Sequence, residues 1–264
     1  MKEIDMPLVE ALKNYNKSAP IRFHMPGHKG RKLNVLKELE RNLFSWDVTE
    51  IPGLDDLQQP SGPIKRAQEK LANLYDADSS FFLVNGASSG IIAMMGACAG
   101  PGDEIIISRA SHKSVLSALI ITGAKPVYLM PEKDEDLGVY TQVTPEAVAK
   151  ALEENQKAKA VLLTSPVYQG FCPDLKRISE IVHGKNKILL VDEAQGPHFF
   201  FNPSLPKSAG EFADGWVQSP HKMLTSLTQS AWLHIKGNKI DKSILKAFIN
   251  LVTSTSPSYI LMAS

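Results

Sequence analysis

Short, continuously apolar runs alternate with segments of helical spacing between residues 80 and 191. Five of these runs have the length of buried strands, and they cover residues 81–84, 105–108, 126–129, 160–164 and 187–191. A strand that is apolar on both faces lies inside a sheet covered by helices, and strands separated by helices usually run parallel. The sequence therefore predicts an α/β fold with a doubly wound, mostly parallel sheet.

Several polar residues come directly after these runs or in the loops that follow them. They are Ser88, His112, Ser165 and Asp192. In doubly wound sheets, ligands bind beyond the carboxyl ends of the strands. We therefore expect these four residues to contribute to one site.

The turn at residues 85–90 reads Asn-Gly-Ala-Ser-Ser-Gly and opens an apolar helix. Backbone N–H groups at a helix N-terminus, together with serine hydroxyls, attract a phosphate. The turn lacks the lysine of a P-loop and the glycine spacing of a dinucleotide-binding loop, so ATP and NAD are not favoured. A phosphate cup is one interpretation of this turn, and a helix cap without a ligand is the other.

An acid and a lysine predict the chemistry of the site. Asp192 ends an apolar run, and Lys222 follows about thirty residues later at the end of the tetrapeptide SPHK. A lysine can form a Schiff base with pyridoxal phosphate (PLP), and a buried acid can keep the ring nitrogen protonated so that the ring accepts electrons. Taken singly, Lys222 could be a surface lysine, Asp192 a loop cap and His112 a helix-start residue. Together they favour a PLP site.

Composition excludes several other classes of protein. The chain has 264 residues, of which 43% are hydrophobic and 22% charged, as in a soluble protein with one large domain. Its net charge of +1 provides no basic surface for nucleic acid or membranes. Cys98 and Cys172 lie far apart and are expected to be reduced thiols. Neither a signal peptide nor an apolar run long enough to span a membrane is evident, so we expect a cytoplasmic protein.

We expect two parts in the chain. Residues 1–45 would form an N-terminal arm with a helix and a mouth loop, and residues 46–264 a large PLP-binding domain. Apolar residues at helical spacing predict the helix of the arm over residues 7–17.

The loop after this helix contains two histidines, His24 and His28, among proline and glycine. Two histidines four residues apart share a metal only when a helix places them on one face, and Pro26 and Gly27 prevent a helix here. We therefore predict no metal site and interpret the loop as the mouth of the active site. A purely structural turn is the alternative.

These motifs together resemble the Orn/Lys/Arg decarboxylases of PLP fold type I, in the short bacterial form that lacks an N-terminal receiver-like domain. The resemblance covers essentially the whole chain. It rests on FHMPGHKG at 23–30, the stretch 47–57, FFLVNGASSG at 81–90, SRASHKSV at 108–115, LTSPVYQG at 163–170, VDEAQG at 191–196, QSPHKMLTSLTQ at 218–229 and TSTSPSY at 253–259. It implies the large domain of an aspartate aminotransferase-like fold.

The resemblance also implies roles for single residues. Lys222 corresponds to the Schiff-base lysine and Asp192 to the partner of the ring nitrogen. His112 matches the histidine that stacks on the cofactor ring, and Ala194 packs on the opposite face.

Further residues correspond to the positions that hold the phosphate and the ring hydroxyl. The phosphate positions match Ala87, Ser88, Ser219 and His221, and Ser165 falls near the 3-hydroxyl of the ring. Family members build their sites at a dimer interface, so Thr255 or Ser256 is expected to reach the phosphate of a partner subunit in a homodimer or higher homo-oligomer.

The activity that the resemblance implies is PLP-dependent decarboxylation of arginine, lysine or ornithine to a polyamine-pathway amine. Two features depart from the family pattern. Gln195 stands where related chains often carry His or Trp, and the sequence ends at Ser264, where family members continue into a C-terminal domain. We therefore expect a truncated form that lacks the closing domain.

Three other functions are alternatives to decarboxylation. The chain could bind the cofactor without decarboxylating a substrate, or it could catalyse another fold type I reaction, such as that of an aminotransferase or a Cα–Cβ lyase. The spacing Ser219-x-x-Lys222 also occurs in penicillin-recognising serine hydrolases, but the Ser-Asp-Asn and Lys-Thr-Gly elements of those enzymes are absent from the sequence.

Overall fold

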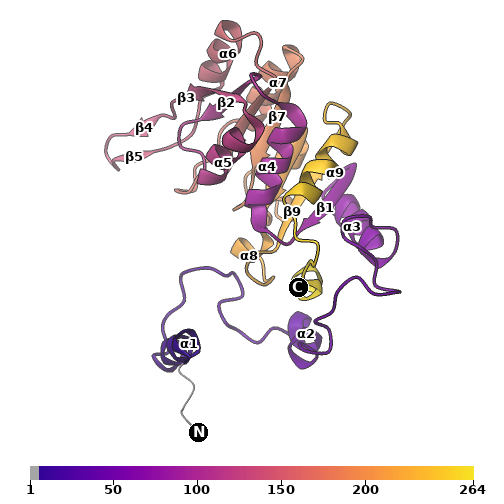
Figure 1. Cartoon of the computed structure of the whole chain (residues 1–264). Coiled ribbons are helices and arrows are strands. Elements are labelled where there is room, and N and C mark those ends of the chain that lie inside the picture. Colours follow the sequence, from indigo (N-terminus) through magenta and orange to yellow (C-terminus); the bar gives the residue numbers. More distant parts are fainter. Residues whose placement is uncertain (1–5) are drawn as a thin grey trace.

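A seven-stranded sheet forms the centre of the protein, in the order β1-β9-β8-β7-β6-β2-β3 (Figure 1). The computed structural model describes residues 6–264, apart from the side chain of Val35. The strands are β1 (Ser79–Leu83), β2 (Glu104–Ser108), β3 (Lys125–Leu129), β6 (Ala160–Thr164), β7 (Ile188–Asp192), β8 (Gly215–Gln218) and β9 (Ala231–Ile235). Strands β3, β2, β6, β7 and β8 pair in parallel, and β9 runs antiparallel to both β8 and β1. The predicted α/β fold with a mostly parallel sheet is confirmed.

Two hydrophobic clusters lie on the two faces of the sheet. Successive strand residues point to opposite faces, so Ile105 and Ile107 of β2 belong to one cluster and Ile106 to the other. Helices on the first face are α4 (Gly86–Cys98), α5 (Lys113–Thr122) and α9 (Lys242–Leu251), and those on the second are α6 (Pro145–Glu154) and α7 (Leu175–Gly184) (Figure 1). Because helices cover both faces, β2, β6 and β7 carry apolar residues on both faces along most of their length, as the sequence pattern indicates.

The helices begin where the sequence places their start signals. Thr144 caps α6, since its hydroxyl accepts a hydrogen bond of 3.2 Å from the N–H of Ala147, and Pro145 occupies the first turn. Helix α1 covers Pro7–Lys17, the same residues that the apolar spacing predicts. A further helix, α3 (Pro63–Leu74), contributes Leu71 to the second cluster.

Smaller elements complete the chain. They are η1 (Asn34–Leu36), α2 (Lys37–Arg41), the hairpin of β4 (Lys133–Asp134) and β5 (Val139–Tyr140), η2 (Phe199–Phe201), η3 (Ala209–Glu211), α8 (Pro220–Met223) and α10 (Tyr259–Ala263). The β4–β5 hairpin is absent from the sequence prediction, because two-residue strands leave no periodic signal. Within residues 6–264, none of the helices combines the length and the hydrophobicity that crossing a membrane requires.

The N-terminal segment lies beside the sheet domain and not within its layers (Figure 1). Helix α1 buries none of its residues, and its apolar Leu8 and Leu12 are 73% and 56% exposed. The loop that follows approaches α8, where the N–H of Gly27 donates a hydrogen bond of 2.7 Å to the carbonyl of His221. The N-terminal loop therefore touches the segment that carries Lys222.

Candidate active site

A cavity of about 490 Å³ opens at the carboxyl ends of the parallel strands. Residues from the loops after β1, β2, β6, β7 and β8 line it. Eight of the nine residues predicted for a PLP site are among them: Ala87, Ser88, His112, Asp192, Ala194, Ser219, His221 and Lys222. Parallel strands bring their carboxyl ends to one edge of the sheet, and this explains why residues far apart in the sequence meet there.

Asp192 is the last residue of β7 and lies at the bottom of this site, with 3% of its surface exposed. Its carboxylate accepts a hydrogen bond of 3.1 Å from the N–H of Ala194. Burial raises the pKa of Asp192, while that N–H and the nearby Lys222 and His112 act in the opposite direction. A buried carboxylate in this state is stabilised by a cationic partner, which the ring nitrogen of PLP would provide.

Lys222 is carried by the short helix α8, which begins with Pro220. The N–H of Lys222 donates to the carbonyl of Ser219 at 2.9 Å, so its backbone is held in a tight turn. Among residues 6–264, its ammonium group forms neither a hydrogen bond nor an ion pair. The amine is therefore available to a ligand in the cavity.

A cradle for an anion lies between α4 and α8. Helix α4 starts at Gly86, with φ of +73°. Within residues 6–264 no side chain caps its first N–H groups, and the helix N-terminus around Ala87 and Ser88 faces the cavity. The hydroxyl of Ser219 is buried without a hydrogen-bond partner in the described part of the chain. Leaving a buried hydroxyl unpaired costs about 1–3 kcal/mol, so this group fits a site that is completed by a phosphate.

His221 and His112 stand on two sides of the cavity. Nδ1 of His221 lies 2.7 Å from the carbonyl of Ser230 and therefore carries a proton, and burial lowers the pKa of the ring. His112 caps α5: its Nδ1 accepts from the N–H of Ser114 at 3.3 Å and lies 2.8 Å from the hydroxyl of the same residue. These contacts hold the His112 ring at the edge of the cavity, where it can lie against a planar ligand.

Ser165 is the predicted residue that does not line this cavity. It is buried and instead borders a smaller cavity of about 160 Å³ together with Cys172. Its neighbours Thr164 and Pro166 line the main cavity, because alternate residues at the end of a strand face opposite sides. The predicted role of Ser165 at the ring hydroxyl remains a prediction.

Thr164 lines the cavity, but the sequence does not predict it as a site residue. Its hydroxyl is buried and, among the described residues, has no hydrogen-bond partner, and it stands beside Asp192 in the parallel register of β6 and β7. The register is the signal that would have found it, and it is known only once the strands are paired. Thr255 and Ser256 are exposed and lie outside the cavity lining, so their predicted contact with a partner subunit is untested.

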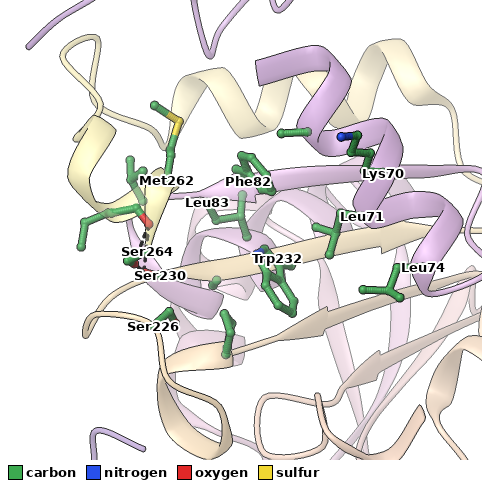
Figure 2. A pocket seen from close by; sticks show the side chains of 15 residues that line it. Lys70, Leu71, Leu74, Phe82, Leu83, Ser226, Ser230, Trp232, Met262 and Ser264 are labelled. Carbon is green, nitrogen blue, oxygen red and sulfur yellow. Dashed lines mark hydrogen bonds between the residues drawn. The ribbon is translucent and has the colours of Figure 1, made fainter. Parts of the chain in front are cut away.

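A second, mainly apolar cavity of about 280 Å³ lies between α3, β1, β9 and α10. Figure 2 shows Leu71, Phe82 and Trp232 around it, with the hydroxyls of Ser230 and Ser264 at one end. None of the predicted cofactor residues lines it. Its lining includes Pro220, whereas the residues on either side of Pro220 line the first cavity.

The loop histidines make local contacts in the structure. Nδ1 of His28 accepts from the N–H of Gly30 at 3.0 Å, and Nε2 of His24 contacts the hydroxyl of Tyr15. Within residues 6–264, no group of three or more His, Cys, Asp or Glu side chains has the arrangement of a metal site.

Comparison with known families gives one match over nearly the whole chain. The family model described as Orn/Lys/Arg decarboxylase, major domain, matches residues 6–264. The chain is 41% identical to an arginine decarboxylase of Bacillus cereus, over 100% of this chain and 58% of the relative. It is 40% identical to an arginine decarboxylase of Bacillus subtilis, again over 100% of this chain and 55% of the relative. The chain thus spans about half the length of the curated relatives it matches.

Solved structures agree with this match. Lysine decarboxylase A from Pseudomonas aeruginosa superimposes with a TM-score of 0.75 and 26% identity, over 98% of this chain and 39% of that chain. An aspartate aminotransferase of Thermus thermophilus superimposes with a TM-score of 0.64 at 19% identity, over 91% of this chain and 64% of that chain, which shows a shared fold. The fold is that of the PLP-dependent enzymes of fold type I.

Proposed function

The chain belongs to the Orn/Lys/Arg decarboxylase family, and we propose that it carries the cofactor-binding part of a PLP-dependent decarboxylase of a basic amino acid. The observation that carries this proposal is the cavity at the carboxyl ends of the strands, where Lys222, Asp192 and His112 meet. Because the chain spans only part of its relatives' length, the decarboxylase activity of the whole protein is itself part of this proposal.

Four residues would hold the ring of the cofactor. When bound, PLP supplies an electron sink for the bond that breaks at the α-carbon of the substrate. Lys222 would hold it through its free amine, and Asp192 would keep a proton on the ring nitrogen, because a buried carboxylate favours a cation beside it. His112 would lie against one face of the ring, and the small Ala194 leaves room at the other.

The phosphate would occupy the cradle between α4 and α8. The hydroxyls of Ser219 and Ser88 would donate to its oxygens, and the start of α4 would add backbone N–H groups and the positive end of the helix dipole. His221 lines the same cavity, and the negative charge of a phosphate would favour its protonated form. The unpaired hydroxyl of Ser219 supports this assignment.

The substrate class follows from the relatives. Four relatives at 40–41% identity are named arginine decarboxylases, and relatives at 27–28% include both lysine decarboxylases and an arginine decarboxylase. Among the described residues that line the cavity, Asp192 is the one carboxylate, and it is assigned to the cofactor. Recognition of the distal cation of arginine, lysine or ornithine would therefore use groups outside this lining. The product would be an amine of the polyamine type, formed in the cytoplasm.

A second copy of the chain is part of the proposal. The apolar side chains of Leu8, Leu12, Phe23 and Phe44 are exposed along the N-terminal segment. Exposed apolar surface of this kind is typical of protein interfaces, and it supports a homodimer or a higher homo-oligomer with shared sites.

Absorption spectra of the chain with added PLP test the proposal directly. We expect a cofactor band that borohydride treatment converts to a stable adduct on Lys222, detected by mass spectrometry. Lys222→Ala should lose both signals. Lys70→Ala is the matched control, because Lys70 lines the second cavity (Figure 2) and its loss should leave the band unchanged. A band that survives in Lys222→Ala would refute the assignment.

Substrate tests then separate the possible reactions. Release of carbon dioxide from arginine, lysine or ornithine supports decarboxylation. A cofactor band without release from any of the three indicates a chain that binds PLP but does not decarboxylate. Transfer of the amino group to a keto acid, without carbon dioxide, indicates an aminotransferase.

A further inference from the structure

Four buried polar side chains form a row across four neighbouring strands, behind the cofactor cavity. Glu193 directly follows β7, Gln218 ends β8, His234 lies in β9 and Ser80 in β1. The first three are fully buried, and Ser80 is 4% exposed. Burying four polar groups costs free energy unless each has a hydrogen-bond partner. Each member of this row has such a partner.

Glu193 is surrounded by hydrogen-bond donors. Its Oε1 accepts from the N–H of Ala209 at 2.6 Å, and its Oε2 accepts from the hydroxyl of Ser208 at 3.1 Å and from Nε2 of Gln218 at 2.6 Å. Burial raises the pKa of Glu193 to about 7, against the opposing effect of these donors. No cation pairs with Glu193 in the described part of the chain.

The carboxylate gives the row a direction. Because Nε2 of Gln218 donates to Glu193, its Oε1 faces His234 and accepts from Nε2 of that ring at 3.2 Å. Burial lowers the pKa of His234 to about 3, so the ring is neutral. Its single proton lies on Nε2, because that atom faces the acceptor Oε1 of Gln218. Nδ1 of His234 then accepts from the hydroxyl of Ser80 at 2.7 Å. Trp216 stacks on the ring, with centroids 4.9 Å apart, and limits its movement.

The first contact of the row lies between two segments that form the cavity. Glu193 follows Asp192, and Gln218 precedes Ser219. The backbones of the two segments are also joined, by a bond of 2.9 Å from the N–H of Glu193 to the carbonyl of Val217. The side-chain bond between Glu193 and Gln218 therefore ties the strand end that carries Asp192 to the one that leads into Ser219.

We propose that Glu193 is a positioning residue for the cofactor site: by orienting Gln218 it holds the backbones of Asp192 and Ser219 at the separation that the bound cofactor requires. This inference rests on the proposed PLP site. Neither the Glu193 nor the Gln218 side chain lines the cavity, so both act on the cofactor indirectly, through the backbones of Asp192 and Ser219.

Glu193→Gln tests the direction of the row without any cofactor. The N–H of Ala209 cannot turn, so the amide oxygen of the new side chain stays on it and the amide nitrogen replaces Oε2. Two donors then face each other, and Gln218 must reverse its amide. The reversed amide presents its N–H to Nε2 of His234, and the ring must carry its proton on Nδ1. At a pH well above the pKa of Glu193, where its side chain is a carboxylate, nitrogen-15 spectra of histidine-labelled protein should therefore show the Nε2-H tautomer of His234 in the wild type and the Nδ1-H tautomer in the variant.

Cofactor affinity then tests the positioning role. We expect Glu193→Gln to raise the dissociation constant of PLP about fivefold, because a neutral amide–amide hydrogen bond replaces the one to a charged carboxylate. Ser80→Ala is the control, because it removes the far end of the row but keeps the contact between Glu193 and Gln218. It should lower the melting temperature of the cofactor-free protein while changing the dissociation constant less than about twofold.

The outcomes separate this inference from the proposed function. If the wild type does not bind PLP, the proposed site is wrong. If the wild type binds PLP and Glu193→Gln binds it equally tightly, the site stands and the positioning role is refuted. Should Glu193→Gln fail to fold, Gln218→Met removes the contact altogether, and it must weaken PLP binding by at least about fivefold or the inference fails.

Discussion

The N–H of Gly27 donates a hydrogen bond of 2.7 Å to the carbonyl of His221, and this bond joins the N-terminal loop to the helix that carries Lys222. The two backbones approach so closely that only glycine fits: a Cβ at position 27 would lie 1.9 Å from the carbonyl oxygen of Leu224. The loop at residues 23–30 thus supports the segment of Lys222 from outside the sheet.

Gly27→Ala should separate this loop from α8. Because the atom in the way belongs to the backbone, the clash cannot be relieved by a rotamer change, and we expect a loss of about 1–3 kcal/mol in the free energy of unfolding. Denaturant titration measures it. Gly184→Ala is the matched control, since no atom of the described residues lies within 4 Å of a Cβ at that position. Equal stability of the two variants would contradict the close contact.

Ser219→Ala should affect stability and cofactor binding in opposite directions. The buried hydroxyl has no partner among residues 6–264, so its removal should stabilise the cofactor-free protein, by up to about 1 kcal/mol. The same change should weaken PLP binding by about tenfold, because a donor to the phosphate is lost. Ser226→Ala, whose hydroxyl is equally unpaired but lines the second cavity, should stabilise the chain without weakening PLP binding. Melting curves and PLP titrations measure both effects.

Asp192→Asn should stabilise the cofactor-free protein at pH 7. Burial raises the pKa of Asp192 in the folded state above its unfolded value. The charged form therefore opposes folding above the folded pKa, and this cost disappears as the pH falls towards the unfolded pKa near 3.8. Unfolding free energies of the wild type and the variant should differ at pH 7 and converge at about pH 4.

Asp214→Asn provides the contrast to Asp192→Asn. The carboxylate of Asp214 is also largely buried, but it accepts from the N–H of Leu189 at 2.8 Å and pairs with His183 at 2.9 Å. Its replacement should destabilise the chain, because these partners lose their acceptor. If both variants shifted stability in the same direction, the assignment of Asp192 as a carboxylate awaiting a cation would be wrong.

Asp55 should make the stability of the chain sensitive to acid. Burial acts to raise its pKa, but the backbone N–H groups of Ser61, Gly62, Asp56 and Lys65 outweigh this and lower the pKa to about 2. The carboxylate therefore contributes stability above its unfolded pKa near 3.8, and this contribution is lost as the pH falls from about 4 to 2.

Asp55→Asn should remove this part of the acid sensitivity. The variant should be less stable at pH 7, by about 1 kcal/mol or less, because the group is close to solvent. Acid titration of the unfolding free energy would show a shallower slope between pH 4 and 2 in the variant. Identical slopes in both proteins would contradict the role of these hydrogen bonds.

The layered fold can be predicted from the sequence, and so can the edge of the sheet at which the candidate site lies. Continuous apolar strands such as residues 160–164 require cover on both faces, and helix start signals such as Thr144-Pro145 act over only a few residues. Strand-end positions of a parallel sheet share one edge whatever the order of the strands. This rule predicts that Asp192 and His112 are neighbours, whereas Lys222 is predicted from its spacing after Asp192 and from the family resemblance. The structure brings all three to one cavity.

The order of the strands and their register cannot be read from the sequence. Thr164 and Pro166 line the main cavity and Ser165 borders the smaller one, and the place of Thr164 beside Asp192 depends on the register of β6 and β7. The row of Glu193, Gln218, His234 and Ser80 depends on the order β7-β8-β9-β1, which joins residues up to 154 positions apart. Strand order and register arise from the packing of whole layers, and a local sequence pattern does not contain them.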